Sequence, residues 1–337
     1  MKNTFFLSIC IPSYNRPHTL TRLLQSIDSK YFNDIQIVIC EDKSPMREEV
    51  RDAVNTYRNS SSYAIKYVEN VKNLGFDANW RELSLQADGE YLLYMGDDDR
   101  FIPNALDNYI QWLKEHSSYC YILRSYVRRT ESSIEYFRYY SHDAFFEPGV
   151  EAYEEFFLKS VSMSGYTVKR ECALQFLTSD LDDTLLFQLY LLAEICLKYP
   201  SAYCNTPCVE LVSDQVQLFG NSDVEKEKYI PGTSVAANMN FLLSYFKITQ
   251  YIDKKYGIQT TEKIKKEFSK YSFYSLRVQR KYGRKHLKSY ANVMKSHGLD
   301  SSWYFYLYFW SLYIFGSEAC LWVIRVIKKM VGRRLIL

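Results

Sequence analysis

The feature that most constrains the fold is an alternation of short apolar runs with helix-type segments between residues 5 and 116. Each apolar run is bounded by turn-forming residues, which is typical of a buried strand. The predicted strands are residues 5–11, 35–42, 64–70 and 90–96, and the predicted helices run from about Pro17, over 46–58, after Gly75 and over 103–116. This alternation predicts an α/β fold with a doubly wound, mostly parallel sheet.

Polar side chains gather where these predicted strands end. They are Asn15 and Arg16 after the first strand, Glu41 and Asp42 at the second, Asn70 and Asn73 at the third, and Asp97, Asp98 and Asp99 after the fourth. The carboxyl ends of parallel strands meet at one edge, so we expect these side chains in one crevice. The glycine fingerprints of dinucleotide sites and P-loops do not occur after the first strand. Side chains and a metal are therefore expected to hold the ligand.

The three adjacent aspartates 97–99 require a cation or solvent, because neighbouring carboxylates repel one another. Mg²⁺ and Mn²⁺ commonly bind one or two protein carboxylates together with substrate phosphates. The alternative is a solvated turn in which one aspartate caps the next helix. The polar residues at the three other strand ends favour the cation.

Beyond residue 118 the alternation weakens. The sequence indicates a strand over 119–129, a helix over 150–161, a strand leading into a helix over 164–172, and an apolar helix over 182–199. Residues 213–234 contain glycine and proline and are predicted to be a loop. This loop divides a first domain, residues 1–212, from a helical, basic and aromatic region, residues 235–337.

Composition excludes several classes of protein. With 47% hydrophobic and 24% charged residues the chain is globular, and a net charge of +3 is too small to indicate a nucleic-acid partner. The eight cysteines lack the spacing of a zinc site or a disulfide framework, and the first residues do not form a signal peptide. We therefore expect a protein of the reducing cytosol that binds no nucleic acid.

Four segments together resemble a known family. LSICIPSYNRPHTLTRLLQSI, VICEDKS, KNLGFDANW and ADGEYLLYMGDDDRFIPNAL are similar to the successive motifs of family 2 glycosyltransferases with the GT-A fold, over roughly residues 5–115. With the later SGYTVKRE stretch, the chain is most similar to O-antigen sugar transferases of the abequosyltransferase kind. The resemblance implies a GT-A type nucleotide-diphospho-sugar transferase fold followed by a helical C-terminal region.

The resemblance also implies roles for residues that bind the nucleotide sugar. Pro12 and Tyr14 would line the nucleotide pocket, with Asn15 and Arg16 beside them. Asp42 would accept a hydrogen bond from a pyrimidine base.

Further residues are implicated at the third and fourth strand ends. Asn73 would lie near the base or ribose, and Asp97 near the ribose or the sugar. Asp98 takes the position of the metal-binding aspartate of the D-x-D motif, with Asp99 as second ligand or sugar contact, so Mn²⁺ or Mg²⁺ is the expected cofactor. Gly96 departs from the family, in which many members have aspartate at this position.

Family 2 enzymes invert the anomeric centre in a single displacement, so the resemblance implies a carboxylate base on the acceptor side. The candidates are Asp180, Asp182 and Asp183, of which Asp183 is the first choice and Asp182 the second. The alternative is that these aspartates only cap the predicted helix 182–199.

The C-terminal region contains an uncharged aromatic run, residues 303–317. It is too short to span a hydrocarbon core, which takes about 20 residues. Its Trp and Tyr residues suit the headgroup zone, and Arg325, Lys328, Lys329, Arg333 and Arg334 would face anionic lipid. We expect a helix that lies on the inner face of the cytoplasmic membrane; the alternatives are packing on the protein's own core or on a second subunit in a homo-oligomer.

Together these observations predict an inverting, metal-dependent glycosyltransferase. It would move a sugar from a nucleoside-diphosphate sugar to a polyprenyl-diphosphate-linked glycan in surface polysaccharide (O-antigen or capsule) synthesis. One alternative is a nucleotidyltransferase, although the chain has no glycine-rich basic loop after its first strand to hold a triphosphate. The other is a non-catalytic nucleotide- or glycan-binding module, which the departure at Gly96 leaves open.

Overall fold

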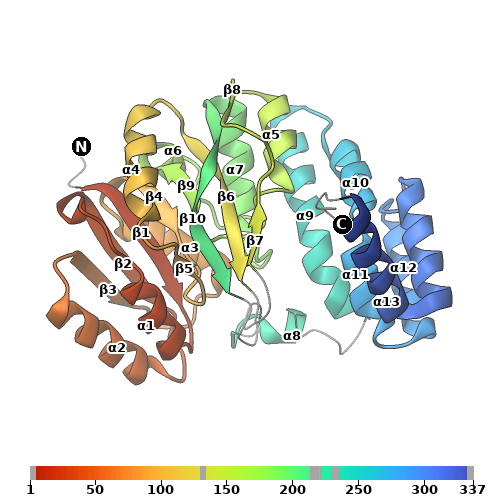
Figure 1. Ribbon diagram of the computed structural model, residues 1–337, viewed down its shortest axis with the longest axis horizontal. Helices are drawn as coiled ribbons and strands as arrows, with labels where there is room; N and C mark the ends of the chain where they lie inside the picture. Colours follow the sequence, from red (N-terminus) through yellow and green to blue (C-terminus); the bar gives the residue numbers. More distant parts are fainter. Residues whose placement is uncertain (1–4, 130–133, 213–219, 221, 230–234, 332–337) are drawn as a thin grey trace. The chain divides into compact units, whose positions relative to one another are not determined.

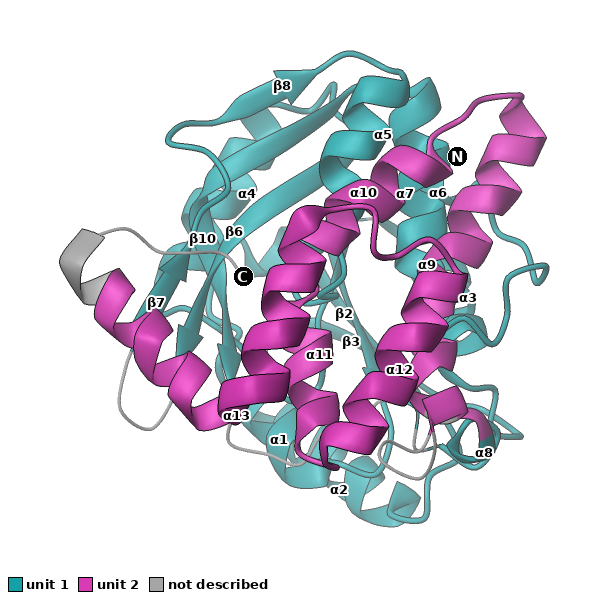
Figure 2. Ribbon diagram, turned by 90° about the vertical axis from the view of Figure 1, so that its right-hand side faces the viewer, with its two compact units in different colours: residues 1–227 teal, residues 228–337 magenta. Residues whose placement is uncertain are grey.

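The computed structural model describes residues 5–129, 134–212, 220, 222–229 and 235–331 (Figure 1). The chain forms two compact units, residues 1–227 and 228–337, which Figure 2 colours separately. The division falls within the predicted loop 213–234, where the short helix α8 (Lys226–Tyr229) was not expected. Residues 213–219, 221 and 230–234 of that loop lie outside the described part of the chain.

The N-terminal half of the first unit confirms the predicted alternation. Its parallel strands are β1 (Phe5–Ser13), β2 (Ile35–Glu41), β3 (Ala64–Glu69) and β4 (Gly89–Tyr94), in the order β3-β2-β1-β4. The helical segments that connect and follow them are α1 (Pro17–Gln25), the 3-10 turn η1 (Phe32–Asp34), α2 (Arg47–Ser60), α3 (Phe76–Gln86) and α4 (Ala105–Glu115). Ile9 of β1 pairs with Ile37 and with Leu93, so the strand ends are aligned at one edge.

The second half of the sheet is mixed rather than parallel. Strand β9 (Tyr166–Lys169) lies antiparallel between β4 and β6 (Tyr121–Arg129). Strand β10 (Ser201–Val212) runs parallel to β6 and was not predicted, because Pro207 interrupts its pattern where the register shifts between Cys204 and Val209. The short strands β5 (Arg100–Phe101), β7 (Ile134–Phe137) and β8 (Ala144–Phe146) pair antiparallel with β10, β6 and β10.

The helices of this half are α5 (Val150–Phe157), α6 (Arg170–Leu174) and α7 (Phe187–Lys198). Helix α7 begins later than the predicted residue 182, since Asp183 (φ 66°) and Leu185 (φ 58°) adopt left-handed backbone conformations that interrupt a helix. The prediction of a helix from residue 182 is therefore wrong at its N-terminus.

Helices pack on both faces of the sheet. Leu20, Leu23 and Leu24 of α1 are fully buried in one cluster with the strand residues, which bears out the helical spacing read from the sequence. On the opposite face Trp80 of α3 stacks on Tyr94 of β4 with ring centroids 3.9 Å apart. This packing fixes the strand ends relative to the start of α3.

The second unit is helical, as expected for residues 235–290 (magenta in Figure 2). Its helices are α9 (Val235–Tyr256), α10 (Thr261–Lys270), α11 (Phe273–Arg280), α12 (Arg284–Ser296) and α13 (Trp303–Val331). Helix α13 is broken at Gly316, whose φ of 81° and ψ of 175° are not helical. Leu276, Leu287, Met294 and Leu312 are fully buried in this unit's own core.

Candidate active site

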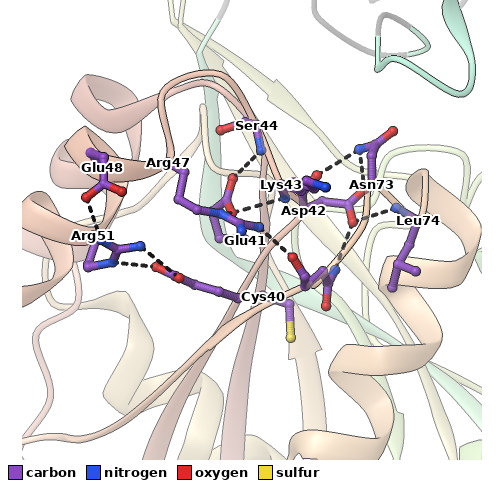
Figure 3. Close-up of polar contacts among 12 residues, drawn as sticks. Cys40, Glu41, Asp42, Lys43, Ser44, Arg47, Glu48, Arg51, Asn73 and Leu74 are labelled. Atoms are coloured by element: carbon purple, nitrogen blue, oxygen red, sulfur yellow. Dashed lines mark hydrogen bonds and ion pairs between the residues drawn. The ribbon is translucent and has the colours of Figure 1, made fainter.

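Asp42, directly after β2, organises the turn that precedes α3 (Figure 3). One carboxylate oxygen accepts hydrogen bonds from Asn70 Nδ2 and the Leu74 amide at 2.8 Å, and the other accepts from Asn73 Nδ2 at 2.8 Å and the Gly75 amide at 2.9 Å. Burial raises the pKa of Asp42, while these hydrogen bonds act in the opposite direction. A nucleotide base could bond to this carboxylate only if one of these hydrogen-bond donors moved away.

Glu41 fixes the loop that carries Asp42 (Figure 3). Its buried carboxylate accepts the amides of Lys43 at 3.0 Å and Ser44 at 2.6 Å, and also binds the Arg47 guanidinium. Arg47 in turn donates to the carbonyl oxygen of Asn70 at 2.6 Å. The second and third strand ends are thus tied together.

Three side-chain oxygens near these strand ends are buried without a hydrogen-bond partner among the described residues: Ser13 Oγ, Asn15 Oδ1 and Ser44 Oγ. Buried polar atoms of this kind point to a missing water or ligand. Asn15 also has a left-handed backbone (φ 63°) and follows the half-buried Pro12 and Tyr14. The predicted nucleotide residues at the end of β1 therefore include oxygen atoms that a ligand would satisfy.

The segment 222–226 contacts the same residues, which the sequence did not predict. The Val224 amide donates to Asn73 Oδ1 at 3.3 Å, and the buried Glu225 carboxylate accepts the Phe76 amide at 2.5 Å. Burial raises the pKa of Tyr14, and the charge of the nearby Asp223 adds to this effect. No sequence signal marked Glu225, since it lies in the predicted boundary loop.

The first two aspartates of the triplet share one arginine. Arg16 Nη1 lies 3.1 Å from Asp97 Oδ1 and 2.7 Å from Asp98 Oδ2. The Tyr14 amide also donates to Asp97 Oδ2 at 3.4 Å, and Arg22 donates to the Asp98 carbonyl. Burial raises the pKa of Asp97 to about 7, against the opposing charge of Arg16. The structure thus brings Tyr14, Arg16, Asp97 and Asp98 together, as predicted.

Asp99 faces the other half of the sheet. Its carboxylate accepts the Ser164 hydroxyl and the Val212 amide, the latter at 2.9 Å. Ser164 Oγ also accepts the Gly96 amide at 2.9 Å, so one hydroxyl bridges the two ends of the turn. A Cβ at Gly96 would lie only 2.9 Å from Asp98 Oδ1 and 3.1 Å from Ser164 Oγ, so a side chain at this position would require Asp98 or Ser164 to shift. Ser164 was marked in the sequence only by its place in the SGYTVKRE stretch.

The fit to a divalent cation rests mainly on Asp98. The part of the chain that the structure describes contains no group of three or more His, Cys, Asp or Glu side chains arranged for a metal. The oxygens of Asp97 and Asp99 already accept protein hydrogen bonds. Asp98 Oδ2 is paired with Arg16, but the Asp98 side chain is 16% exposed. An oxygen-only site of this kind fits Mg²⁺ or Mn²⁺, which take few protein ligands and complete their shell with phosphate and water.

The candidate bases lie on the turn before α7. Asp182 forms an ion pair with Arg81 of α3, with a second contact from Nη2 at 2.8 Å, whereas Asp183 is exposed. The N-cap of α7 is Leu186, and Asp77 of α3 accepts the amides at this helix start. The N-cap position is thus occupied by Leu186 rather than by one of the predicted aspartates, and Asp77, which bonds these amides, was missed despite its place in the NLGFDANW motif.

Comparison with known proteins finds similarity to glycosyl transferases, in agreement with the resemblance seen in the sequence motifs. The model of the family "Glycosyl transferase family 2" matches residues 8–169. The abequosyltransferase RfbV of Salmonella typhimurium is 32% identical over 100 residues, which are 30% of this chain and 30% of that protein. The GalNAc(5)-diNAcBac-PP-undecaprenol beta-1,3-glucosyltransferase of Campylobacter jejuni is 26% identical over 130 residues, 38% of this chain and 40% of its own length. The similarity thus spans less than half of each relative.

Solved structures match over a greater length. The crystal structure of Staphylococcus aureus TarS residues 1–349 in complex with UDP-GlcNAc has a TM-score of 0.53 at 14% identity, and the match covers 87% of this chain and 92% of that one. At this identity the likeness concerns the fold alone, and it confirms the expected α/β architecture of the GT-A type followed by helices.

Proposed function

Because residues 8–169 form a family 2 glycosyl transferase domain, we propose that this chain transfers a sugar from a nucleoside-diphosphate sugar to a hydroxyl of a glycan. The observation that carries the proposal is the Arg16–Asp97–Asp98 cluster, which lies at the end of β4 and is bonded to the end of β1 through Tyr14. A guanidinium next to carboxylates, beside buried oxygens without partners, suits a ligand that carries both phosphate and polar ring atoms.

The donor nucleotide would bind at the ends of β1 and β2. Pro12, Tyr14 and Asn15 line the approach from β1, while Asp42 and Asn73 hold the turn before α3. Arg16 and Asp97, which pair with each other, would contact the diphosphate and sugar. Tyr14 offers a ring on which a base stacks.

Asp98, with Asp99 as the second candidate, would hold Mn²⁺ or Mg²⁺. A divalent cation there supplies Lewis-acid stabilisation of the negative charge on the leaving diphosphate. Ser164 keeps the Gly96–Asp99 turn in one shape while the donor binds.

Asp183 would act as the general base in an inverting displacement. Its carboxylate takes the proton of the acceptor hydroxyl, the acceptor oxygen bonds to the anomeric carbon, and the bond from that carbon to the diphosphate breaks with its electron pair on the leaving group. Asp182 is the second candidate; its carboxylate is paired with Arg81.

The acceptor would be a polyprenyl-diphosphate-linked glycan in O-antigen or capsule synthesis. The Campylobacter jejuni relative is named for an acceptor linked to undecaprenol through a diphosphate, which supports this class. A lipid-linked acceptor places the enzyme at the inner face of the cytoplasmic membrane.

Charge and exposure of the second unit support contact with that membrane. Residues 228–337 contain 20 of the chain's 42 Lys and Arg residues but only five of its 39 Asp and Glu residues. Helix α13 exposes large apolar side chains along its length: Trp303, Leu307, Trp310, Ile314, Phe315 and Trp322. Such a combination suits a helix lying in the interface of an anionic bilayer.

Residues 303–327 of α13 are also long and apolar enough to cross a membrane by length and composition. Two features favour the interface instead. The helix is broken at Gly316, and Arg280 and Arg284 donate to the carbonyls of Leu312 and Ile314 at 2.9 and 3.3 Å, so two cations lie midway along the apolar stretch. Charged groups there oppose insertion through the hydrocarbon.

The decisive experiment measures release of nucleoside diphosphate from UDP-, GDP-, CDP- and TDP-sugars with Mn²⁺, for the wild type and for Asp98→Ala. Turnover of one donor that Asp98→Ala abolishes would support the proposal and identify the nucleotide. Pyrophosphate release from a nucleoside triphosphate would instead indicate a nucleotidyltransferase. Binding of a nucleotide without turnover would indicate a non-catalytic module.

A further inference from the structure

The turn between residues 182 and 187 has a costly backbone. Asp183 and Leu185 both have positive φ, at 66° and 58°, and Leu185 is bulky and buried. A left-handed conformation at such residues is strained and persists only where the surroundings enforce it. Something outside the turn must therefore hold it.

Asp77, in the first turn of α3, supplies that restraint. Its carboxylate is 3% exposed and accepts three backbone amides: Oδ2 binds those of Thr184 at 2.8 Å and Leu185 at 2.9 Å, and Oδ1 binds that of Phe187 at 2.9 Å. Thr184 Oγ1 in turn accepts the Leu186 amide at 3.3 Å. Leu186, the N-cap residue of α7, has no side-chain group that bonds the first amides of the helix. Asp77, more than a hundred positions away in the chain, bonds amides at this helix start instead.

A second anchor lies one helical turn further along α3. Arg81 pairs with Asp182 through both of its terminal guanidinium nitrogens, Nη1 and Nη2. Arg81 and Asp77 are four residues apart and so share one face of the helix. Asp183 is the exposed residue between the two anchored segments of the turn.

The start of α3 is itself tied to the nucleotide-binding strand ends. Asp42 binds the amides of Leu74 and Gly75 just before the helix, and Glu225 binds that of Phe76. The residues 74–77 therefore connect the Asp42 turn to the Asp183 turn without an intervening flexible segment.

We propose that Asp77 is a positioning residue that holds the strained 182–187 turn in the geometry in which Asp183 accepts the acceptor proton. The proposal rests on the glycosyl transfer proposed above. It assigns Asp77 a role in the chemical step rather than in donor binding, because its contacts are to the turn that carries the base.

The test compares Asp77→Asn with Asp253→Asn and Asp183→Asn. Asparagine at 77 keeps the size of the side chain but turns an amide NH₂ toward backbone N–H groups, so the turn loses part of its restraint. Asp253 is a matched control, since it too accepts backbone amides at a helix start, those of Thr260 and Thr261 at 2.9 Å.

Asp77→Asn should lower kcat by about 100-fold, the cost of a base displaced by roughly an ångström, with the donor KM nearly unchanged. Asp253→Asn should leave both constants as they are, although it also destabilises the fold. Hydrogen exchange should show faster exchange of the amides of Thr184, Leu185 and Phe187 in Asp77→Asn, but unchanged exchange in Asp183→Asn.

Two outcomes in kcat would overturn the proposal: full kcat in Asp77→Asn, or a loss of kcat in Asp77→Asn while Asp183→Asn keeps the wild-type rate. A rise of the donor KM in Asp77→Asn by the same factor as the fall in kcat would also overturn the proposal, because it would place the effect in donor binding. A wild type that turns over no donor refutes the proposed function itself, and with it the catalytic role of Asp77, whatever the exchange data show about the turn.

Discussion

Arg16 Nη1 lies 2.7 Å from Asp98 Oδ2, and the same nitrogen lies 3.1 Å from Asp97 Oδ1. The side chains of Arg16 and Asp97 are only 13% and 7% exposed, so little water screens this contact. One guanidinium therefore stabilises two neighbouring carboxylates that would otherwise repel each other.

Arg16→Met should lower the free energy of unfolding by about 3 kcal/mol, because removing one partner leaves mostly buried charges unpaired. Urea denaturation measures the loss, and Arg16→Lys should recover part of it. Arg58→Met, at an exposed arginine that bonds Asn55, is the control and should change stability by less than about 0.5 kcal/mol. Equal effects of both Met variants would show that the contact with Asp97 and Asp98 adds nothing.

Asp98→Asn should reduce kcat/KM for donor turnover by at least about 100-fold, since stabilisation of the leaving diphosphate by a bound cation is worth several kcal/mol. Titration with Mn²⁺ should show a matching loss of affinity. Asp52→Asn, at an exposed aspartate of α2, is the matched control. An Asp98→Asn variant with wild-type Mn²⁺ dependence would remove Asp98 from the metal site.

Ser164→Ala should weaken Mn²⁺ binding by about 10–100-fold, as expected when a residue that orients a metal-site carboxylate is lost. Its hydroxyl supports both Asp99 and the Gly96 amide. Ser160→Ala provides the comparison, because that buried hydroxyl bonds Tyr121 and the Phe156 carbonyl instead. Both variants should lose about 1–3 kcal/mol of stability, but only Ser164→Ala should lose metal affinity.

Asp253 should make the second unit sensitive to acid. Burial opposes its ionisation, but the hydrogen bonds from Thr261 and Thr260 prevail and lower the pKa of Asp253 below its usual value. The unfolded carboxyl titrates near pH 3.9, so the stabilisation is present above about pH 4 and is lost as the pH falls through the lower folded value.

Asp253→Asn should therefore differ from the wild type in thermal stability at pH 7 and converge with it toward pH 3. Thermal unfolding followed by circular dichroism across this range measures the difference. A gap between the two proteins that stays constant down to pH 3 would contradict the lowered pKa.

The variant Trp310→Ser/Phe315→Ser should lose binding to vesicles of phosphatidylglycerol and phosphatidylcholine. These side chains are 54% and 69% exposed on α13, and burial of each in the interface is worth about 1.5–3 kcal/mol. Co-sedimentation measures binding, which should also weaken with added salt. Tyr274→Ser, 62% exposed on α11, is the control and should bind like the wild type.

A wild-type protein that does not bind anionic vesicles would contradict the proposed membrane docking. If the same protein is dimeric in solution and the α13 variant is monomeric, the exposed face of α13 instead binds a second copy.

The sequence by itself determined the first half of the sheet and the strand ends at which the polar residues gather. Strands β1 to β4 and helices α1 to α4 are visible in it because apolar periodicity is a local property, set by the repeat of the backbone. The grouping of Arg16, Asp42 and Asp97 followed from one rule, that parallel strands end at the same edge.

The tertiary structure alone decided which groups hold these residues in place. Asp77 lies 107 positions from Thr184, Ser164 lies 65 from Asp99, and Glu225 lies 149 from Phe76. Such contacts leave no periodic pattern, since they depend on how strands β9 and β10 and the turn before α7 pack against the first half of the sheet. The candidate site residues could therefore be predicted from local sequence patterns, whereas the side chains that orient them could not.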